Sequence, residues 1–319
     1  MKRFFNKIYI NLVFTFFIIG IIAILSVSVY KNMMNTEEKK CWQTLEDSAQ
    51  VINEEIVVRL EGNLNIMKLV AGAMVQENRV NSHDVIISHI NEFQQMTIFN
   101  RIDVLYPDEK LLLQTGKMID VSNMVSFEEL AALGEHMSDR TVDIETKKSV
   151  IYYYVPVIRN NEVLAILVGV IDCKELSNIF KVEPYNGQAI CCIVDYSDGN
   201  FIMDDWHSEL GNIFEMKERK KLKRYEDVDL VDDIKNAKTG AIAYVSKKNG
   251  ENSYMYYTPV GIFDWELLII VQENVAFGSM LELKDTLTMV ASVEAVALLV
   301  YLLWTLYMIH IHMNMLVKV

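Results

Sequence analysis

The sequence predicts an α+β protein in which a long helix and two tandem antiparallel-sheet modules are flanked by two transmembrane helices. Three observations lead to this fold class. The 319 residues are 51% hydrophobic, but the apolar excess is concentrated at the two ends of the chain. A helical pattern of apolar residues follows the first end, and strand-like segments separated by turn residues fill the rest. The net charge of −13 is opposite to that of a typical nucleic-acid-binding protein, so we expect no nucleic-acid partner.

The first apolar segment, residues 8–30, contains no charged residue over 23 positions. At about 1.5 Å per residue, a helix of this length crosses the roughly 30 Å hydrocarbon core of a bilayer. The basic start Met1-Lys2-Arg3 and the small residues of Ser26-Val27-Ser28 are also compatible with a cleaved signal peptide. Because the apolar run is longer than a typical signal-peptide core, we expect an uncleaved anchor.

The second apolar segment, residues 287–309, is similar in length but contains Glu294. A carboxylate near mid-span costs about 2.5–3.5 kcal/mol on insertion scales, which the surrounding leucines and valines can offset. Glu294 could contact another helix of a dimer or act as a movable latch. The simpler interpretation, which we favour, is that it lies near the outer interface and reaches toward water. We therefore predict a second transmembrane helix.

The orientation follows from the cations next to the two spans. Lys2, Arg3 and Lys7 precede the first span, and Lys318 follows the second. Cations are enriched on the cytoplasmic side of membrane spans, so both chain ends are predicted to be cytoplasmic. The protein is then a two-pass plasma-membrane protein with the bilayer as a partner. The predicted regions are residues 1–7 and 310–319 in the cytoplasm and residues 31–285 outside.

Residues 31–80 are predicted to form a stalk helix that continues outward from the first span. Apolar or small residues recur at steps of three and four, which is the spacing of one helix face. These residues are Trp42, Leu45, Ala49, Ile52, Ile56, Leu60, Met67, Val70 and Met74, with Asn63 in the one polar position. From Glu37 to Gln76 the helix would extend about 60 Å. The stripe is compatible with packing on the protein's own sheet and with a homodimer seam, and we expect a homodimer.

The rest of the outer segment is predicted to form two modules, residues 81–183 and 184–280. Strand-like segments flank turn residues in each module, as in antiparallel hairpins. The predicted strands are 101–106, 110–114, 150–158 and 163–171 in the first module and 190–196, 201–203, 241–246, 254–259 and 265–272 in the second. Residues 152–157 (YYYVPV) match residues 255–260 (MYYTPV) at an offset of 103, which predicts two copies of one unit. Pro184 and Gly187 mark the boundary between them.

Two further segments carry a resemblance to a known family. Residues 265–271 read WELLIIV, and residues 198–207 read DGNFIMDDWH, followed by LGNI at 210–213. Together with the spans and the long helix, they resemble the double Cache (dCache) sensor region of bacterial transmembrane receptors. Similar sensors are found in Firmicutes, often ahead of GGDEF diguanylate cyclases and sometimes ahead of histidine kinases. The resemblance implies PAS-like (Cache) modules and covers nearly the whole chain.

The resemblance also implies a small-molecule ligand in the membrane-distal module, between its sheet and the loops above it. Members of the family that bind amino acids use an R-x-W-Y cluster and an aspartate at the end of the module's last strand, which holds the ligand's ammonium group. Asp172 matches that aspartate. The stretch that corresponds to the cluster, residues 139–146, reads DRTVDIET and lacks it. The resemblance therefore does not extend to an amino-acid ligand.

Five residues are candidates for ligand binding on physical grounds. Tyr152 and Tyr154 share one face of a strand and offer apolar rings with polar tips. Charge is available from Asp172 at a strand end, Arg140 in the approach loop and Asp103 on the first strand. Each has a structural alternative as well. The tyrosines could pack against the stalk helix, and Asp172 could cap the helix that begins after it.

We find no sequence motif for catalysis. The patterns for phosphate loops, nucleophile elbows, zinc proteases and dinucleotide folds do not occur, and neither does a GGDEF segment or a kinase module. The ten residues after Ile309 are too few for a folded domain. The six histidines show no paired spacing for a metal. We therefore expect a non-enzymatic chain without cofactor or metal.

The cysteines and one basic run each allow two interpretations. A bridge from Cys173 to Cys191 or Cys192 is conceivable in an oxidising compartment, but we favour buried thiols. The basic run could meet anionic lipid or a cell-wall polymer, but we favour a solvated face paired with the acidic residues that follow. Its members are Lys217, Arg219, Lys220, Lys221, Lys223 and Arg224.

The function expected from these features is that of a membrane-anchored extracytoplasmic sensor. It would bind a small solute in the distal module and transmit a conformational change through its spans. One alternative is the front end of a diguanylate cyclase or histidine kinase whose catalytic domain is missing from this chain. Another is a truncated receptor that only dimerises with longer relatives.

Overall fold

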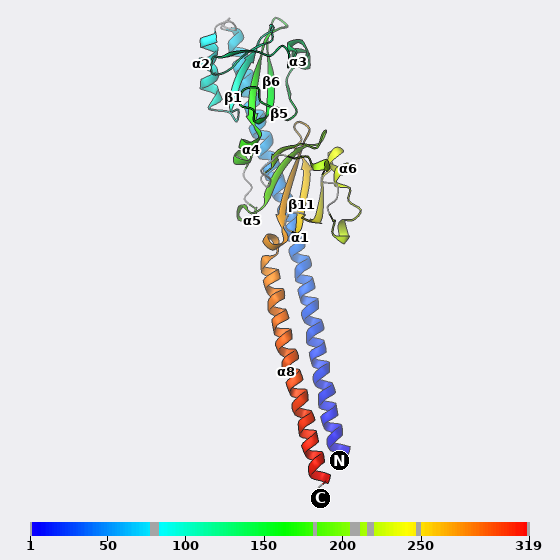
Figure 1. Ribbon diagram of the computed structural model, residues 1–319. Helices are drawn as coiled ribbons and strands as arrows, with labels where there is room; N and C mark the ends of the chain where they lie inside the picture. The colour runs from blue at the N-terminus through cyan, green and yellow to red at the C-terminus, as the bar shows by residue number, and fades with distance from the viewer. Residues whose placement is uncertain are drawn as a thin grey trace. The chain divides into compact units, whose positions relative to one another are not determined.

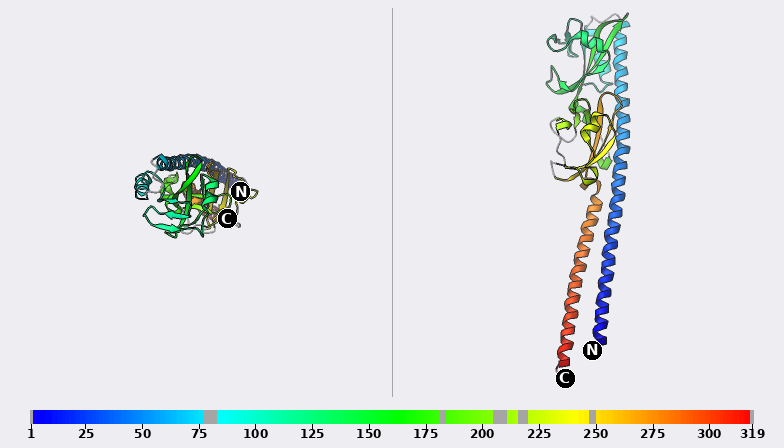
Figure 2. Two further views of the ribbon diagram at one scale, coloured as in Figure 1. Left: turned by 90° about the horizontal axis from the view of Figure 1, so that it is seen from above. Right: turned by 90° about the vertical axis from the view of Figure 1, so that its right-hand side faces the viewer.

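The computed structural model describes residues 2–76, 83–180, 184–204, 211–215, 220–246 and 250–317 (Figures 1 and 2). The chain divides into two compact units. One unit is Gln43–Gln272, and the other combines the two chain ends, Met1–Trp42 and Glu273–Val319. Three sequence features lie partly outside the described residues. They are the cation Lys318 after the second span, the last three residues of the 198–207 motif (205–207), and Lys217 and Arg219 of the basic run.

The unit of the chain ends consists of helices. It contains the first part of α1 (Lys2–Gln76), α7 (Glu273–Ala276) and α8 (Gly278–Val317), and within it α1 and α8 run side by side (Figures 1 and 2). Both long helices contain windows that are long and apolar enough to cross a membrane, with mean hydropathies of 2.5 and 2.0. The predicted spans 8–30 and 287–309 fall inside α1 and α8. Glu294 lies on the exposed surface of α8.

α1 continues without interruption from the first predicted span into the stalk. From Leu45 to Met74 the predicted stripe is buried against the rest of the unit Gln43–Gln272, and only Trp42 at its start is half-buried. Asn63, the polar member of the stripe, accepts a hydrogen bond from the backbone N–H of Ile98 at 2.9 Å. Its amide also donates to the carbonyl of Arg59. The prediction that the stripe packs on the protein's own sheet is confirmed.

The first sheet has seven strands in the order β3-β2-β1-β7-β6-β4, with β5 also paired to β6, and all pairs are antiparallel. Helices α2 (His83–Gln94), α3 (Phe127–Leu133) and α4 (Cys173–Ile179) accompany it. The strands are β1 (Arg101–Leu105), β2 (Lys110–Leu112), β3 (Met118–Asp120), β4 (His136–Met137), β5 (Thr141–Val142), β6 (Ser149–Arg159) and β7 (Glu162–Asp172). The β6–β7 hairpin turns at Asn160 and Asn161, whose φ angles of 50° and 70° suit asparagine in a two-residue turn.

The two faces of the first sheet have different partners. Tyr153 pairs with Gly169, and a side chain on Gly169 would meet Phe99 and Met67 of α1, so this face packs on the stalk helix. Tyr154 lies on the opposite face, in a core with Phe127 of α3, and Tyr152 packs against the same core. The alternative that Tyr152 and Tyr154 pack against the stalk helix is therefore wrong, because strand alternation directs Tyr153 there instead.

The second sheet has five strands in the order β10-β11-β12-β8-β9. They are β8 (Ile190–Asp195), β9 (Phe201–Asp204), β10 (Gly240–Val245), β11 (Asn252–Pro259) and β12 (Trp265–Gln272). Between them lie η1 (Ile213–Glu215), η2 (Lys223–Tyr225) and α6 (Leu230–Lys235). The order β9-β8-β12-β11-β10 repeats the order β2-β1-β7-β6-β5 of the first sheet. The matching segments YYYVPV and MYYTPV lie on the corresponding strands β6 and β11.

The segment between the sheets forms a turn. Within α5 (Pro184–Gly187), Tyr185 and Asn186 have φ angles of 55° and 57°, which are left-handed and not those of a right-handed helix.

The cysteines match the favoured interpretation, whereas Lys221 of the basic run has partners other than the expected ones. All four cysteines are buried and no disulfide joins them, so the prediction of buried thiols is confirmed. Lys221 donates to the backbone carbonyls of Glu226 and Val228, and is thus engaged by its own segment. These carbonyls, and not the acidic side chains that we expected, are the partners of Lys221.

Candidate functional site

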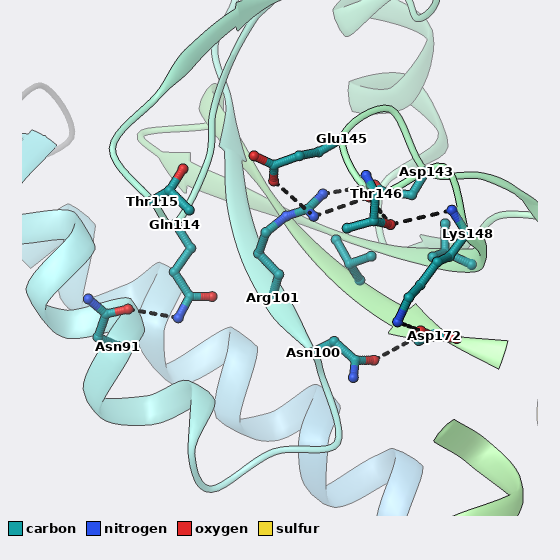
Figure 3. A pocket seen from close by; sticks show the side chains of 12 residues that line it. Asn91, Asn100, Arg101, Gln114, Thr115, Asp143, Glu145, Thr146, Lys148 and Asp172 are labelled. Atoms are coloured by element: carbon teal, nitrogen blue, oxygen red, sulfur yellow. Dashed lines mark hydrogen bonds and ion pairs between the residues drawn. The ribbon is translucent and has the colours of Figure 1, made fainter. Parts of the chain in front are cut away.

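A pocket of about 440 Å³ opens at one end of the first sheet, on the face opposite to the stalk helix (Figure 3). Strands β1, β6 and β7, the end of α2, the segment after β2 and the loop between β5 and β6 contribute its walls. Val150 and Val170 are its apolar residues, and the other lining residues are polar or charged. The charged ones are Arg101, Asp143, Glu145, Lys148 and Asp172.

Arg101 forms the centre of the pocket's charge network, with 11% of its side chain exposed. Its Nε lies 2.7 Å from Oδ2 of Asp103, and its two terminal nitrogens lie 2.8 and 3.2 Å from the carboxylate of Asp143. A further contact of 3.3 Å reaches Glu145. Arg101 and Asp103 face the same way because they are two positions apart on β1. Burial alone would lower the pKa of Arg101, but the hydrogen bonds and charges of Asp143 and Asp103 raise it.

Asp143 connects the β5–β6 loop to the sheet. It is fully buried and accepts hydrogen bonds from the backbone and hydroxyl of Thr146 at 2.8 and 2.7 Å, and from the hydroxyl of Tyr152 at 3.0 Å. Burial acts to raise its pKa, but the hydrogen bonds from Arg101 and Thr146 outweigh burial and lower the pKa. Asp143 is therefore ionised at neutral pH. Burial and the charge of Asp143 raise the pKa of Tyr152. The Tyr152 hydroxyl therefore stays protonated and can donate to Asp143.

Asp103 lies deeper, behind Arg101. Its side chain is fully buried, and its Oδ1 accepts from the backbone N–H of Gln114 at 3.0 Å. Burial raises its pKa to about 6, although Arg101 acts in the opposite direction. A charged or a protonated form of Asp103 can thus exist near neutral pH, and Arg101 stabilises the charged form.

Asp172 ends β7 and begins α4 at the wall of the pocket. Its Oδ1 accepts from the backbone N–H of Lys174 at 2.9 Å, so the helix-capping alternative is confirmed. Its Oδ2 lies 2.6 Å from Nζ of Lys148, whose side chain is 58% exposed (Figure 3). The backbone N–H of Asp172 donates to Oδ1 of Asn100 at 2.6 Å.

The five predicted ligand-binding residues occupy three kinds of position. Asp172 lines the pocket, while Asp103 and Tyr152 support its lining residues from behind. Tyr154 is not among the lining residues: it is buried and stacks on His136, with ring centroids 4.7 Å apart. Arg140 also lies outside the pocket lining, since it donates to the carbonyls of Phe201 at 2.6 Å and Gly211 at 3.4 Å.

Sequence reasoning missed four charged residues of the pocket, namely Arg101, Asp143, Glu145 and Lys148. The one available signal was the alternation of Arg101 with Asp103 on a predicted strand. Among the residues that the structure describes, no group of three or more His, Cys, Asp or Glu side chains could hold a metal ion. The lining of the pocket presents charged groups together with hydrogen-bond donors and acceptors.

Comparison with known proteins identifies the family and the fold. The family model of the Cache domain matches residues 32–280, which confirms the resemblance to a double Cache sensor region. The sensory domain of the Campylobacter jejuni chemoreceptor Tlp3, solved with isoleucine bound, is similar at 12% identity and a TM-score of 0.52, over 76% of this chain and 96% of that one. The ligand-binding domain of Mlp24 with asparagine is similar at 15% identity and a TM-score of 0.53, over 76% and 98%.

The extracellular domain of the putative histidine kinase soHK1S-Z6 is similar at 13% identity and a TM-score of 0.58, over 77% of this chain and 99% of that one. At these identities the three likenesses establish a shared fold. No curated protein sequence matches the chain.

Proposed function

Since the chain belongs to the Cache domain family, we propose that it is a membrane-anchored sensor that binds a small solute outside the cell and passes a conformational signal across the membrane. The pocket on the first sheet is the observation that carries this proposal. Its volume of about 440 Å³ lies in the range of small-molecule sites, and its polar side chains converge from three strands and a loop. The sensory domain of Tlp3 was solved with isoleucine and the ligand-binding domain of Mlp24 with asparagine, which supports a solute about the size of an amino acid.

The proposed ligand contacts are a revision of the predicted set. Asp172, Lys148 and Glu145 would contact the solute, because their charged groups line the pocket. Lys148 and Glu145 are partly exposed, and the Lys148 ammonium that pairs with Asp172 can be replaced. Tyr152 and Asp103 would hold Asp143 and Arg101 in place. Tyr154 would pack in the core on this face of the sheet, and Arg140 would take part in signal transmission.

The proposed arrangement in the membrane is the predicted one. Residues 8–30 and 287–309 would span the plasma membrane, residues 31–285 would lie outside, and both chain ends would be cytoplasmic. The shared strand order of the two sheets supports two modules built as copies of one unit. Protease treatment of intact cells tests this topology, because digestion should remove the outer region. Protection of that region in intact cells would contradict the proposal.

A homodimer is proposed through the outward face of α1. Val51, Val58 and Leu69 are 65%, 68% and 68% exposed, and their spacings of 7 and 11 residues keep them on one helix face. Gly62 and Gly72 have open space at the Cβ position. This surface is distinct from the buried stripe, so the same helix can serve the sheets and a second copy.

Signal transmission is proposed to pass through Arg140. The residue stands three positions before Asp143 of the pocket loop and donates to the carbonyls of Phe201 and Gly211 beside the second sheet. A solute that shifts the loop would therefore shift the hairpin of β8 and β9. Tyr153 and Phe263, whose ring centroids are 6.2 Å apart, make a second contact between the two sheets.

The binding step is tested with the full chain in lipid nanodiscs, by thermal unfolding in the presence of amino acids, amines, carboxylates and nucleosides. A solute at 100 times its Kd stabilises the native state by about 2.7 kcal/mol. We expect at least one class to raise the Tm, and Asp172→Asn to reduce that rise. Asparagine also caps helices, so the variant keeps α4. Absence of a response to every class would contradict the proposed function.

The transmission step is tested by hydrogen exchange with the solute found in that screen. In the unmodified chain, we expect binding to change the protection of β9 as well as that of the first sheet. Arg140→Gln should confine the change to the first sheet without altering the Kd by more than about two-fold. Lys147→Gln, at an exposed position in the loop between β5 and β6, is the control. An unchanged response of β9 in Arg140→Gln would contradict this role of Arg140.

A second candidate function is that of the sensing part of a diguanylate cyclase or histidine kinase. The similarity in fold to the extracellular domain of the putative histidine kinase soHK1S-Z6 favours this alternative. The catalytic module would then lie outside this sequence. Reading the gene beyond the codon for Val319 tests it, since a continuing frame would encode that module.

A further inference from the structure

We infer, on the premise of the proposed sensor function, that the solute bound by this pocket is a small organic cation, a primary amine without a carboxylate. The Tlp3 and Mlp24 domains were solved with amino acids, which carry both charges. The pocket described above can replace one of its own ammonium groups by that of a ligand, whereas its buried guanidinium, Arg101, is already paired with the protein's own carboxylates.

Arg101, which would be the natural partner of a carboxylate, is already saturated. Three carboxylates share its guanidinium, through contacts of 2.7 Å to Asp103, 2.8 and 3.2 Å to Asp143, and 3.3 Å to Glu145. The side chains of Asp103 and Asp143 are fully buried. A ligand carboxylate could bind Arg101 only by displacing one of them, and removing a partner from a buried ion pair strongly destabilises a protein.

Lys148, by contrast, is a replaceable cation. Its Nζ lies 2.6 Å from Asp172, but 58% of its side chain is exposed, so its ammonium can move into water at little cost (Figure 3). Asp172 cannot follow, because the same carboxylate caps α4 through Lys174. A ligand ammonium can therefore take the place of the Lys148 ammonium on a carboxylate that is fixed in position.

The charge balance of the pocket also favours a cation. Asp143, Glu145 and Asp172 outnumber Arg101 and Lys148 among its lining residues. Clefts with an excess of one charge attract ligands of the opposite sign. Glu145, with 28% of its side chain exposed, holds only the longest of the Arg101 contacts and can accept further hydrogen bonds.

The class of solute is tested with sets of compounds that differ in one charged group. Isobutylamine, valine and isovalerate share an isobutyl group, to which they attach the ammonium, both charged groups and the carboxylate, respectively. 1,4-Diaminobutane and ornithine form a second set. With the full chain in nanodiscs, we expect an amine to raise the Tm and its carboxylate-bearing partners to have little effect. A carboxylate or amino acid that stabilises the protein more than its amine would overturn the inference and leave the sensor function standing.

Lys148→Gln separates the two ligand classes by the sign of its effect. If the Lys148 ammonium competes with the ligand, the variant should bind the amine several-fold more tightly. If the ligand carries a carboxylate that Lys148 attracts, the variant should bind it more weakly, which would overturn the inference. Asp172→Asn should weaken amine binding on the order of 10-fold or more, as expected for a charged hydrogen bond. Lys110→Gln removes the same charge from an exposed pair with Asp108 outside the pocket lining and should change neither affinity.

Discussion

Gly169 is a residue at which the first sheet packs closely against Phe99 and against Met67 of α1. A Cβ atom at this position would lie 2.6 Å from the Phe99 ring and 2.9 Å from the sulfur of Met67. Both neighbours are buried, with 2% and 0% exposure, and cannot move aside into solvent. The close contact of β7 with α1 therefore depends on the absence of a side chain.

Gly169→Ala should lower the free energy of unfolding by about 1–3 kcal/mol, the usual cost of adding a methyl group to a packed core. Gly72→Ala on α1 is the control. Nothing lies within 4 Å of its Cβ position, so the added helix propensity should stabilise the protein by about 0.5–1 kcal/mol. Denaturant unfolding measures both. Equal effects of the two substitutions would contradict the packing described here.

Residues of the site differ in how far the sequence could predict them. The cap at Asp172 was predictable because its partner, Lys174, is two positions away. The pairing of Arg101 with Asp143 was not, because it depends on how the β5–β6 loop returns to β1 across 42 residues. Arg140 illustrates the same limit, since its partner Phe201 is 61 residues away. Alternation on β6 separated Tyr153 from Tyr152 and Tyr154, but only the structure shows which face meets the helix.

At the scale of elements, β12 carries an unusual feature within the second sheet. Glu266 is fully buried, and neither of its carboxylate oxygens has a hydrogen-bond partner among the described residues. It lies on the face of Leu268 and Ile270, where α6 packs through Ile234. Burial raises the pKa of Glu266 to about 8, and the charge of Asp233 on α6 adds to the shift. Strand β12 thus places the carboxyl group of Glu266, protonated at neutral pH, inside the core of the second sheet.

Glu266 should make the stability of the protein depend on pH in a defined window. Because its pKa is higher in the folded state than in the unfolded state, its contribution is fully present below the unfolded pKa of about 4.5 and is lost as the pH rises through about 8. Between pH 6 and pH 8, the free energy of unfolding should fall by up to about 1.4 kcal/mol per pH unit.

Glu266→Gln should remove this fall, because the amide does not ionise. Glu226→Gln is the matched control, because Glu226 is exposed directly after η2. This variant should keep the pH dependence of the unfolding free energy found in the unmodified chain. Thermal or denaturant unfolding at several pH values gives the slopes. A variant at Glu266 with an unaltered slope would show that another group titrates in this window.

For the whole molecule, the outward face of α1 makes a specific prediction about assembly. If a second copy covers this face, Val58→Cys should form a disulfide-linked dimer in membranes under mild oxidation. The four native cysteines are buried, so they should contribute little background. Glu46→Cys is the control, because Glu46 is exposed and lies 12 residues before Val58, which places it about 120° away around the helix. Cross-linking at both positions to the same extent would argue against a defined seam.

The architecture was predictable to different degrees in its parts. The helical stripe from Leu45 to Met74 and the strand segments are periodic patterns, and such patterns depend on local sequence alone. The order of the strands depends on long-range pairing, for which internal matches such as that of residues 152–157 with residues 255–260 were a guide. The short strands β3, β4 and β5 have no such guide, and the sequence did not predict them.

The shared use of α1 by both sheets has a consequence for biosynthesis. Asn63 of α1 holds Ile98 next to the first sheet, 35 residues later, whereas Asn53 donates to the carbonyl of Pro259, 206 residues later. A nascent chain can therefore close the first sheet on α1 early, while the earlier part of the helix waits for β11 and β12. Such distant pairing slows folding. A ribosome that stops before Pro259 would release a polypeptide in which Asn53 and the part of α1 around it lack this partner, and exposed apolar surface on such incomplete products favours aggregation.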